Sequence, residues 1–330
     1  MRRRDLITML GGAMLGGAHV ALAQQSDRLR RIGVLMPTAE SDPETSDLGA
    51  VFRRAMQDLG WTGGRNLRVD YRWGAGDARR IATLAQQMVA DAPDAILAGG
   101  APVVAPLQRA TTTIPIVFIS ASDAVAQGFV QTLAHPGGNI TGFTNFAPEM
   151  AGRWLALLRE IEPFVARVAV LYNPATAPYT EWFLRALQGA PSAAGVKIEA
   201  TPVHDEGEVD RAMDALQRTG HGGLMVPSDA FTLTHSQAVI DLAAKHRLPA
   251  IYAFRVFATN GGLVSYGVDL ADQMRQAAKY IDRILSGTSP GDLPVQEPSK
   301  FQLVIDVKTA KTLGLTIPPT LLARADEVIE

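Results

Sequence analysis

The stretch Asp94-Ala-Ile-Leu-Ala-Gly-Gly100, followed by a helical segment and then by Ile114-Pro-Ile-Val-Phe-Ile-Ser120, determines the fold. It contains an apolar strand, a glycine turn, a helix and a second apolar strand. The same plan recurs in Gly222-Gly-Leu-Met-Val-Pro-Ser-Asp229 and Leu248-Pro-Ala-Ile-Tyr-Ala-Phe254. Wholly apolar strands of this length are typical of parallel sheets that are covered by helices on both faces. The repetition predicts two similar α/β lobes, each built on a doubly wound parallel sheet.

Short breaks in the alternation of strands and helices indicate where the chain passes between the lobes. These breaks lie at residues 144–148, 267–269 and 295–298. The expected division of the chain is lobe 1 at residues 30–144 and 268–295, and lobe 2 at residues 145–267 and 296–330. Three short crossovers between two lobes restrict their relative motion to a hinge.

Length and composition agree with two soluble lobes and exclude several classes of protein. A chain of 330 residues is too long for one ordinary core. Its 47% hydrophobic and 19% charged residues are those of a globular protein. The net charge of −2, without a basic cluster in the body of the chain, argues against a nucleic-acid partner. The absence of cysteine excludes disulfides, thiolate nucleophiles and cysteine-based metal sites.

Residues 1–23 have the features of an export signal. Arg2-Arg-Arg4 is basic, residues 6–20 are apolar, and Ala21-Leu-Ala23 has the small-x-small pattern of a cleavage site. We expect a signal peptide that is cleaved near Ala23 and a periplasmic mature protein. Arg3-Arg4-Asp5-Leu6-Ile7 favours the twin-arginine route, and the general secretory route is the alternative.

The sequence contains no complete motif for catalysis, for metal binding or for cofactor binding. Gly74-Ala-Gly76 begins like a dinucleotide fingerprint, but Arg79 stands at the position of the third glycine. Ser265 has Leu263 where a nucleophile elbow requires glycine. The histidines show no metal-binding spacing. We therefore expect no catalytic residue, no metal and no cofactor.

The candidate binding residues lie in turns at the carboxyl ends of predicted strands, where open α/β sheets bind ligands. They are Thr38, Gly100, Ala101, Ser120, Ser122, Asp123, Asn173, Ser228, Asp229, Tyr252 and Arg255. Backbone N–H groups near Gly100 suit an anion, because a helix follows there. Asp123 or Asp229 would bind an amine, and Tyr252 or Phe254 would flank an apolar group.

Each of these residues also has an ordinary structural interpretation. Asp123 and Asp229 both precede helical segments, and either could act only as a helix N-cap. Gly100 could serve only a tight turn, and Arg255 could be a solvated surface charge. Phe254 is of a type more often found in a core than in a cleft. Because Tyr252 and Phe254 alternate along one predicted strand, their side chains are expected to point to the same side.

Five longer segments make the chain resemble a family, the ABC-transporter substrate-binding proteins that include tryptophan- and tyrosine-binding members. The segments are residues 31–35, 135–142, 170–174, 262–267 and 300–319. The resemblance covers nearly the whole mature chain and implies a type I periplasmic-binding-protein fold, with the ligand between two lobes. It places cleft positions near Gly100-Ala101, Ser122-Asp123, Ser228-Asp229 and Tyr252. Amino-acid-binding members tend to have hydroxyl residues where this chain has Gly99-Gly100-Ala101-Pro102.

Together these observations favour a monomeric periplasmic receptor of an ABC importer. It would close on a small organic solute, for which an amino-acid-like compound is one candidate, and would deliver it to an ABC permease at the inner membrane. One alternative is an exported ligand-binding sensor subunit of a signalling receptor, and another is an exported α/β enzyme such as a hydrolase. A cytoplasmic repressor core is disfavoured, because the chain has no DNA-binding headpiece and begins with an export signal.

Overall fold

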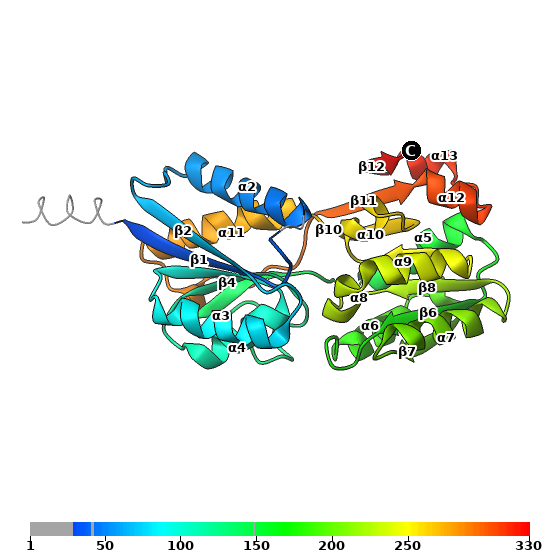
Figure 1. Cartoon of the computed structure of the whole chain (residues 1–330), viewed down its shortest axis with the longest axis horizontal. Helices are drawn as coiled ribbons and strands as arrows, with labels where there is room; N and C mark the ends of the chain where they lie inside the picture. The colour runs from blue at the N-terminus through cyan, green and yellow to red at the C-terminus, as the bar shows by residue number, and fades with distance from the viewer. Residues whose placement is uncertain (1–28, 41–42, 148) are drawn as a thin grey trace, which may run out of the picture.

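The computed structural model describes residues 29–40, 43–147 and 149–330, and these form two α/β lobes side by side (Figure 1). One lobe contains a five-stranded sheet and the other a seven-stranded sheet. The two mainly parallel sheets confirm the predicted fold class. The predicted signal peptide lies outside the described residues. Within the part of the chain that the structure describes, no helix is long and apolar enough to cross a membrane.

Lobe 1 is a parallel sheet with helices on both faces. Its strand order is β2-β1-β3-β4-β5, and each neighbouring pair is parallel. The elements are β1 (Arg30–Met36), α2 (Pro43–Asp58), β2 (Leu67–Trp73), α3 (Ala78–Ala90), β3 (Ala95–Gly99), α4 (Ala101–Ala110), β4 (Ile116–Ala121), β5 (Ile140–Thr144) and, from later in the chain, α11 (Leu270–Leu285).

Lobe 2 repeats this order and adds two strands, giving β12-β11-β10-β9-β8-β6-β7. Its first elements are α5 (Glu149–Ile161), β6 (Arg167–Tyr172), α6 (Thr180–Gln188), the 3₁₀ turn η1 (Pro191–Ala193), β7 (Lys197–Pro202), α7 (Glu206–Gln217) and β8 (Gly222–Val226). Then follow α8 (Ala230–Thr234), α9 (Ser236–Lys245), β9 (Ala250–Tyr252), α10 (Arg255–Thr259) and β10 (Val264–Val268). After α11 the chain forms the 3₁₀ turn η2 (Pro290–Asp292) beside β5 of lobe 1. Lobe 2 is then completed by β11 (Phe301–Asp306), α12 (Val307–Leu313), α13 (Pro319–Leu322) and β12 (Glu327–Ile329).

Strand β11 departs from the parallel pattern, because it is antiparallel to β10. The path of the chain explains this. After β10 the chain leaves lobe 2 and forms α11 against lobe 1, so it re-enters lobe 2 from the hinge and runs the opposite way. The chain thus passes between the sheets after β5, after β10 and before β11. We propose the lobe boundaries given above on this basis.

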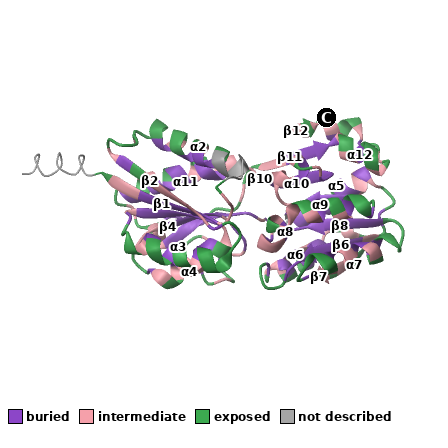
Figure 2. Ribbon diagram, viewed as in Figure 1, coloured by how far each residue is buried: buried purple, intermediate pink, exposed green. Residues whose placement is uncertain are grey.

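The central strands of both sheets are buried on both faces, as Figure 2 shows. In β3 the residues alternate between two cores: Ala95 and Leu97 pack on one face, and Ile96 and Ala98 on the other. Such a strand must be apolar at every position, because neither face meets water. This is the physical reason why the apolar runs in the sequence identified the sheets.

Helix α11 is placed on lobe 1 by an amphipathic pattern. Met274, Ala277, Ala278 and Ile281 are buried and follow the i, i+3, i+4, i+7 spacing of one helix face. The Asp269 side chain accepts a hydrogen bond from the Asp272 N–H at 2.8 Å and so caps the first turn. Helix α11, which follows the second crossing, is therefore held on lobe 1 by the packing of its apolar face against the core.

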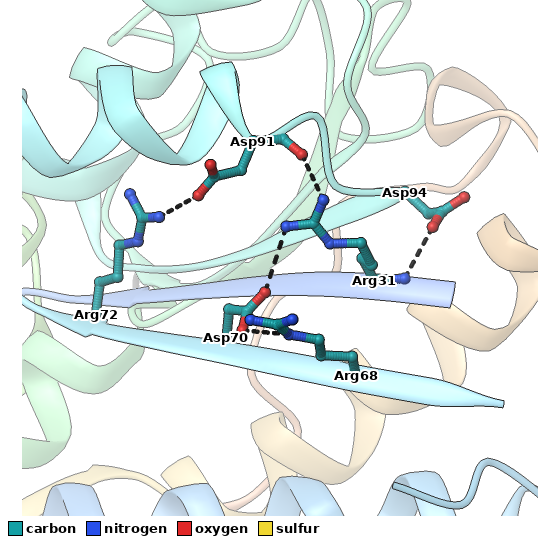
Figure 3. A network of polar contacts seen from close by, with 6 residues as sticks. All are labelled: Arg31, Arg68, Asp70, Arg72, Asp91 and Asp94. Carbon is teal, nitrogen blue, oxygen red and sulfur yellow. Dashed lines mark hydrogen bonds and ion pairs between the residues drawn. The ribbon is translucent and has the colours of Figure 1, made fainter. Parts of the chain in front are cut away.

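A charged network holds the strands of lobe 1 at a surface that includes the amino ends of β1 and β2 (Figure 3). Its members are Arg31, Arg68, Asp70, Arg72, Asp91 and Asp94. The Arg31 N–H donates to Asp94 at 2.8 Å, and the Arg31 guanidinium donates to the Asp91 carbonyl at 2.9 Å. These bonds connect β1 to the turn before β3, and we assign the network a structural role.

Candidate functional site

A cavity of about 110 Å³ lies between the two lobes, at the carboxyl ends of their strands. Lobe 1 contributes Met36, Pro37, Thr38, Leu48, Gly99, Gly100, Ala101, Pro102, Ile119, Ser120, Ser122 and Leu270. Lobe 2 contributes Thr176, Tyr179, Ser228, Asp229, Ala230, Leu233, Phe254 and Val256. A cavity of about 150 Å³ accommodates benzene. This conformation therefore has room for part of a small organic molecule and encloses it from both sides.

The walls of this cavity are largely apolar, with a few polar groups. Leu48 and Ile119 from lobe 1 and Leu233 and Phe254 from lobe 2 are among the residues that line it. Among the described residues that line it, Asp229 alone has an ordinarily charged side chain. Ligand sites with mainly apolar walls and few oriented polar groups are the common type for small organic molecules.

The polar groups at the floor of the cavity are joined by Asn145, which lies in the first crossing and is buried. Its side-chain oxygen accepts a hydrogen bond from the Ser122 hydroxyl at 2.8 Å. Its side-chain nitrogen donates to the Ser228 hydroxyl of lobe 2 at 2.9 Å and to the Ser120 hydroxyl of lobe 1 at 3.4 Å. Asn145 thus connects both lobes directly beneath the site.

Gln273 of α11 holds the ends of β4 and β5 in lobe 1 beside the cavity. Its side-chain oxygen accepts the Ser120 N–H at 2.9 Å, and its amide donates to the Thr144 carbonyl at 2.7 Å. Ser120 has φ 53°, in the left-handed region that non-glycine residues rarely adopt. The helix α11 therefore holds the end of β4 in an unusual conformation beside the cavity.

Asp229 lies at the cavity and is also the N-cap of α8. One carboxylate oxygen accepts the Asn173 N–H at 2.8 Å, and the other accepts the Phe231 N–H at 3.0 Å and the Thr176 hydroxyl. Burial raises the pKa of this carboxyl, and these hydrogen bonds offset the rise only in part. Because the folded-state pKa is raised, the stability that Asp229 contributes is greatest at low pH and decreases as pH rises through that pKa.

We expect Asp229→Ala to lower the free energy of unfolding by about 2 kcal/mol, because the buried Asn173 N–H and the partly buried Phe231 N–H lose their acceptor. Urea unfolding measures this change. Asp123→Ala is the matched control, since Asp123 accepts one bond, from the Ala126 N–H at 3.2 Å. Equal effects of the two substitutions would contradict the capping role of Asp229.

The two lobes also approach each other at the turn after β2. A Cβ atom added to Gly76, which has φ +73°, would lie 2.9 Å from the Thr234 hydroxyl oxygen of α8. The turn after β2 in lobe 1 therefore approaches lobe 2 closely enough that glycine is needed on steric grounds as well as for its backbone conformation.

The structure brings seven of the eleven predicted site residues to the cavity. These are Thr38, Gly100, Ala101, Ser120, Ser122, Ser228 and Asp229. The lining does not include Asp123, Asn173, Tyr252 or Arg255. Asn173 lies behind Asp229, and its side chain accepts the Ala175 N–H at 2.8 Å. Asp123 binds the backbone of its own turn.

Tyr252 and Arg255 lie away from the cavity for reasons of local geometry. The Tyr252 ring is buried and stacks on Phe257, with ring centroids 4.6 Å apart. Strand β9 ends at Tyr252, so the expected alternation does not continue, and Phe254 lines the cavity while Tyr252 does not. Arg255 pairs with Glu327 of β12 through two bonds of 2.7 and 2.8 Å.

Three polar residues of the site were not predicted from the sequence: Asn145, Thr176 and Tyr179. The Tyr179 hydroxyl donates to the Ser228 carbonyl, and burial raises the Tyr179 pKa to about 12. Thr176 and Tyr179 follow β6 by four and seven residues, so the carboxyl-end rule could have found them if the whole loop had been considered. Asn145 follows β5 directly, in a segment whose sequence indicates a crossing between the lobes and not a binding site.

Comparison with known proteins identifies the class. The family model for ABC transporter substrate binding proteins matches residues 41–329. A tyrosine-binding protein from Clostridioides difficile (strain R20291) is 25% identical over 265 residues, which are 80% of this chain and 75% of the relative. The chain therefore belongs to the family of ABC transporter substrate-binding proteins, which is extracytoplasmic and non-enzymatic. The family excludes the alternative of a hydrolase.

Two solved structures agree with this assignment. A conserved domain protein from Vibrio cholerae has a TM-score of 0.82 at 28% identity, over 91% of this chain and 100% of that chain. The ABC domain from Streptococcus pneumonia in complex with L-Trp has a TM-score of 0.81 at 25% identity, over 91% of this chain and 100% of that chain. The protein is thus a solute-binding protein of an ABC transporter with the type I periplasmic-binding-protein fold.

Proposed function

We propose that this protein is the periplasmic receptor of an ABC importer and that it closes on one small organic solute between its lobes. The single observation that supports this most is the cavity whose lining comes from both lobes at the carboxyl ends of both sheets. A ligand shifts an open–closed equilibrium only if it binds the closed form better. Contacts from both lobes supply that preference, and the closed receptor would then deliver the solute to the permease at the inner membrane.

The walls of the cavity favour a ligand with a flat or compact apolar body and a few polar groups. Leu48, Ile119, Leu233 and Phe254 suit such a body, and Ser120 and Ser228 suit its polar groups. The relatives named above are a tyrosine-binding protein and an L-Trp complex. We propose an aromatic amino acid or a compound of similar size and polarity as the solute, bound without metal or cofactor.

Isothermal titration of the purified mature chain tests this function. The panel comprises L-tryptophan, L-tyrosine, L-leucine, L-glutamate, D-glucose and adenine. We expect saturable binding of one aromatic member with a dissociation constant in the micromolar range or below, corresponding to about −8 kcal/mol. Preference for glucose or glutamate would contradict the proposed ligand class, and turnover of any probe would contradict a receptor.

A sensor subunit of a signalling receptor must also bind the solute, so titration does not distinguish it from the receptor of a transporter. Measuring uptake of the solute into cells does distinguish the two. Deletion of the coding sequence should abolish accumulation of the labelled solute in intact cells, and expression of the protein should restore it. Normal accumulation in the deletion strain would favour the sensor.

A further inference from the structure

Asn145 lies at the one place in the described chain where a single side chain hydrogen-bonds hydroxyls of both lobes at the cavity floor. It does not line the cavity itself. Its oxygen accepts from Ser122, and its nitrogen donates to Ser120 and Ser228. The direction of these bonds decides what the three hydroxyls can still do.

A serine hydroxyl carries one proton and two acceptor lone pairs. Because the Asn145 amide donates to Ser120 and Ser228, each of these hydroxyls acts as acceptor and keeps its own proton for another partner. Among the described residues, no group accepts a hydrogen bond from the Ser120 or Ser228 hydroxyl. Both residues are half-buried and line the cavity. Their protons are therefore available to a molecule bound there.

The backbone keeps both hydroxyls in position. The Ser120 N–H is held by Gln273 at 2.9 Å, and the Ser228 carbonyl accepts the Tyr179 hydroxyl. The Ser122 hydroxyl differs, since it is buried and donates to the Asn145 oxygen. The Asn145 amide thus leaves the Ser120 and Ser228 hydroxyls free to donate a hydrogen bond into the cavity. The Ser122 hydroxyl cannot do so, because its proton is already donated to Asn145.

We propose that Asn145 is a positioning residue for ligand specificity: it orients Ser120 of lobe 1 and Ser228 of lobe 2 to donate to one acceptor group of the solute, a carboxylate or carbonyl oxygen. This inference rests on the proposed function, since it assigns a group of the solute to the same cavity. It adds the requirement that the bound solute has a hydrogen-bond acceptor where the two lobes meet.

Asn145→Asp tests the proposal with almost no change in shape. An ionised aspartate side chain only accepts hydrogen bonds, so Ser120 and Ser228 would donate to the introduced carboxylate instead of to the ligand. Calorimetry would use the pairs L-tryptophan with tryptamine and L-tyrosine with tyramine, whose members differ only in the carboxylate. We expect the wild type to prefer the amino acid by roughly tenfold to a hundredfold, as hydrogen bonds to a charged group allow. In Asn145→Asp this ratio should fall to near one.

The ratio within one variant is independent of how much protein is folded. Asn145→Leu, which removes the amide without adding charge, should lower the ratio to an intermediate value. Asn260→Asp makes the same charge change at an exposed position outside the cavity and should leave the ratio unchanged. A preserved ratio in Asn145→Asp, or equal binding of both members of a pair by the wild type, would overturn the role of Asn145 and leave the receptor intact. Failure of all four probes to bind would instead overturn the proposed ligand class, and the inference with it.

Discussion

Ala101→Phe should abolish ligand binding while the protein stays folded. Ala101 is the first residue of α4, and it lines the cavity from lobe 1. A benzene-sized ring needs about 150 Å³, and the cavity measures about 110 Å³. The phenyl ring would therefore fill the space that the solute needs. We expect a loss of affinity of at least about a hundredfold, or ~2.7 kcal/mol, in calorimetric titration.

The control for this substitution places the same ring on the outside of the same helix. Arg109 is exposed near the end of α4, and Arg109→Phe should bind ligand as the wild type does. Thermal unfolding of both variants should remain close to that of the wild type. Wild-type affinity in Ala101→Phe would show that the solute binds somewhere other than this cavity.

Gly267→Ala should have the largest effect on stability. A Cβ atom at Gly267 in β10 would lie 1.8 Å from the carbonyl oxygen of Ala253, which is a backbone atom and cannot rotate away. The chain beside the second crossing would have to shift to relieve the overlap. We expect a loss of about 3 kcal/mol or more in the free energy of unfolding, as for severe overpacking. Urea unfolding followed by circular dichroism measures it.

Gly63→Ala is the matched control, because a Cβ atom there would have no neighbour within 4 Å. Its stability should lie within about 0.5 kcal/mol of the wild type. If Gly267→Ala were as stable as Gly63→Ala, the close packing of β10 against the chain after β9 would be wrong.

The lobes were predictable from the sequence because strands buried on both faces leave an unbroken apolar run. The strands β3, β4 and β8 show this clearly. The antiparallel direction of β11 was not predictable in the same way, since it depends on where the chain re-enters lobe 2 and not on the residues of the strand. Whether a segment forms a strand depends on its local residue pattern. The direction of β11 depends instead on where the chain returns to lobe 2.

The site was predictable where it depends on sheet topology. Residues directly after β3, β4 and β8 line the cavity because parallel strands share one carboxyl edge. Tyr252 failed this rule because β9 is three residues long, and its last side chain faces the core. Asn145 and Tyr179 reach the site from a crossing and from a long loop, whose courses no periodic pattern in the sequence describes.

Closure of the lobes on the ligand can be measured directly, because the chain contains no cysteine and introduced thiols can be labelled alone. Arg79→Cys in lobe 1 and Gln237→Cys in lobe 2 place spin labels at exposed positions three residues beyond the Gly76–Thr234 contact. Arg79→Cys with Arg109→Cys gives a control pair within lobe 1. With saturating ligand, the distance between positions 79 and 237 should become shorter and its distribution narrower, while the control pair stays constant. An identical distribution with and without saturating ligand would contradict a receptor that closes on its solute.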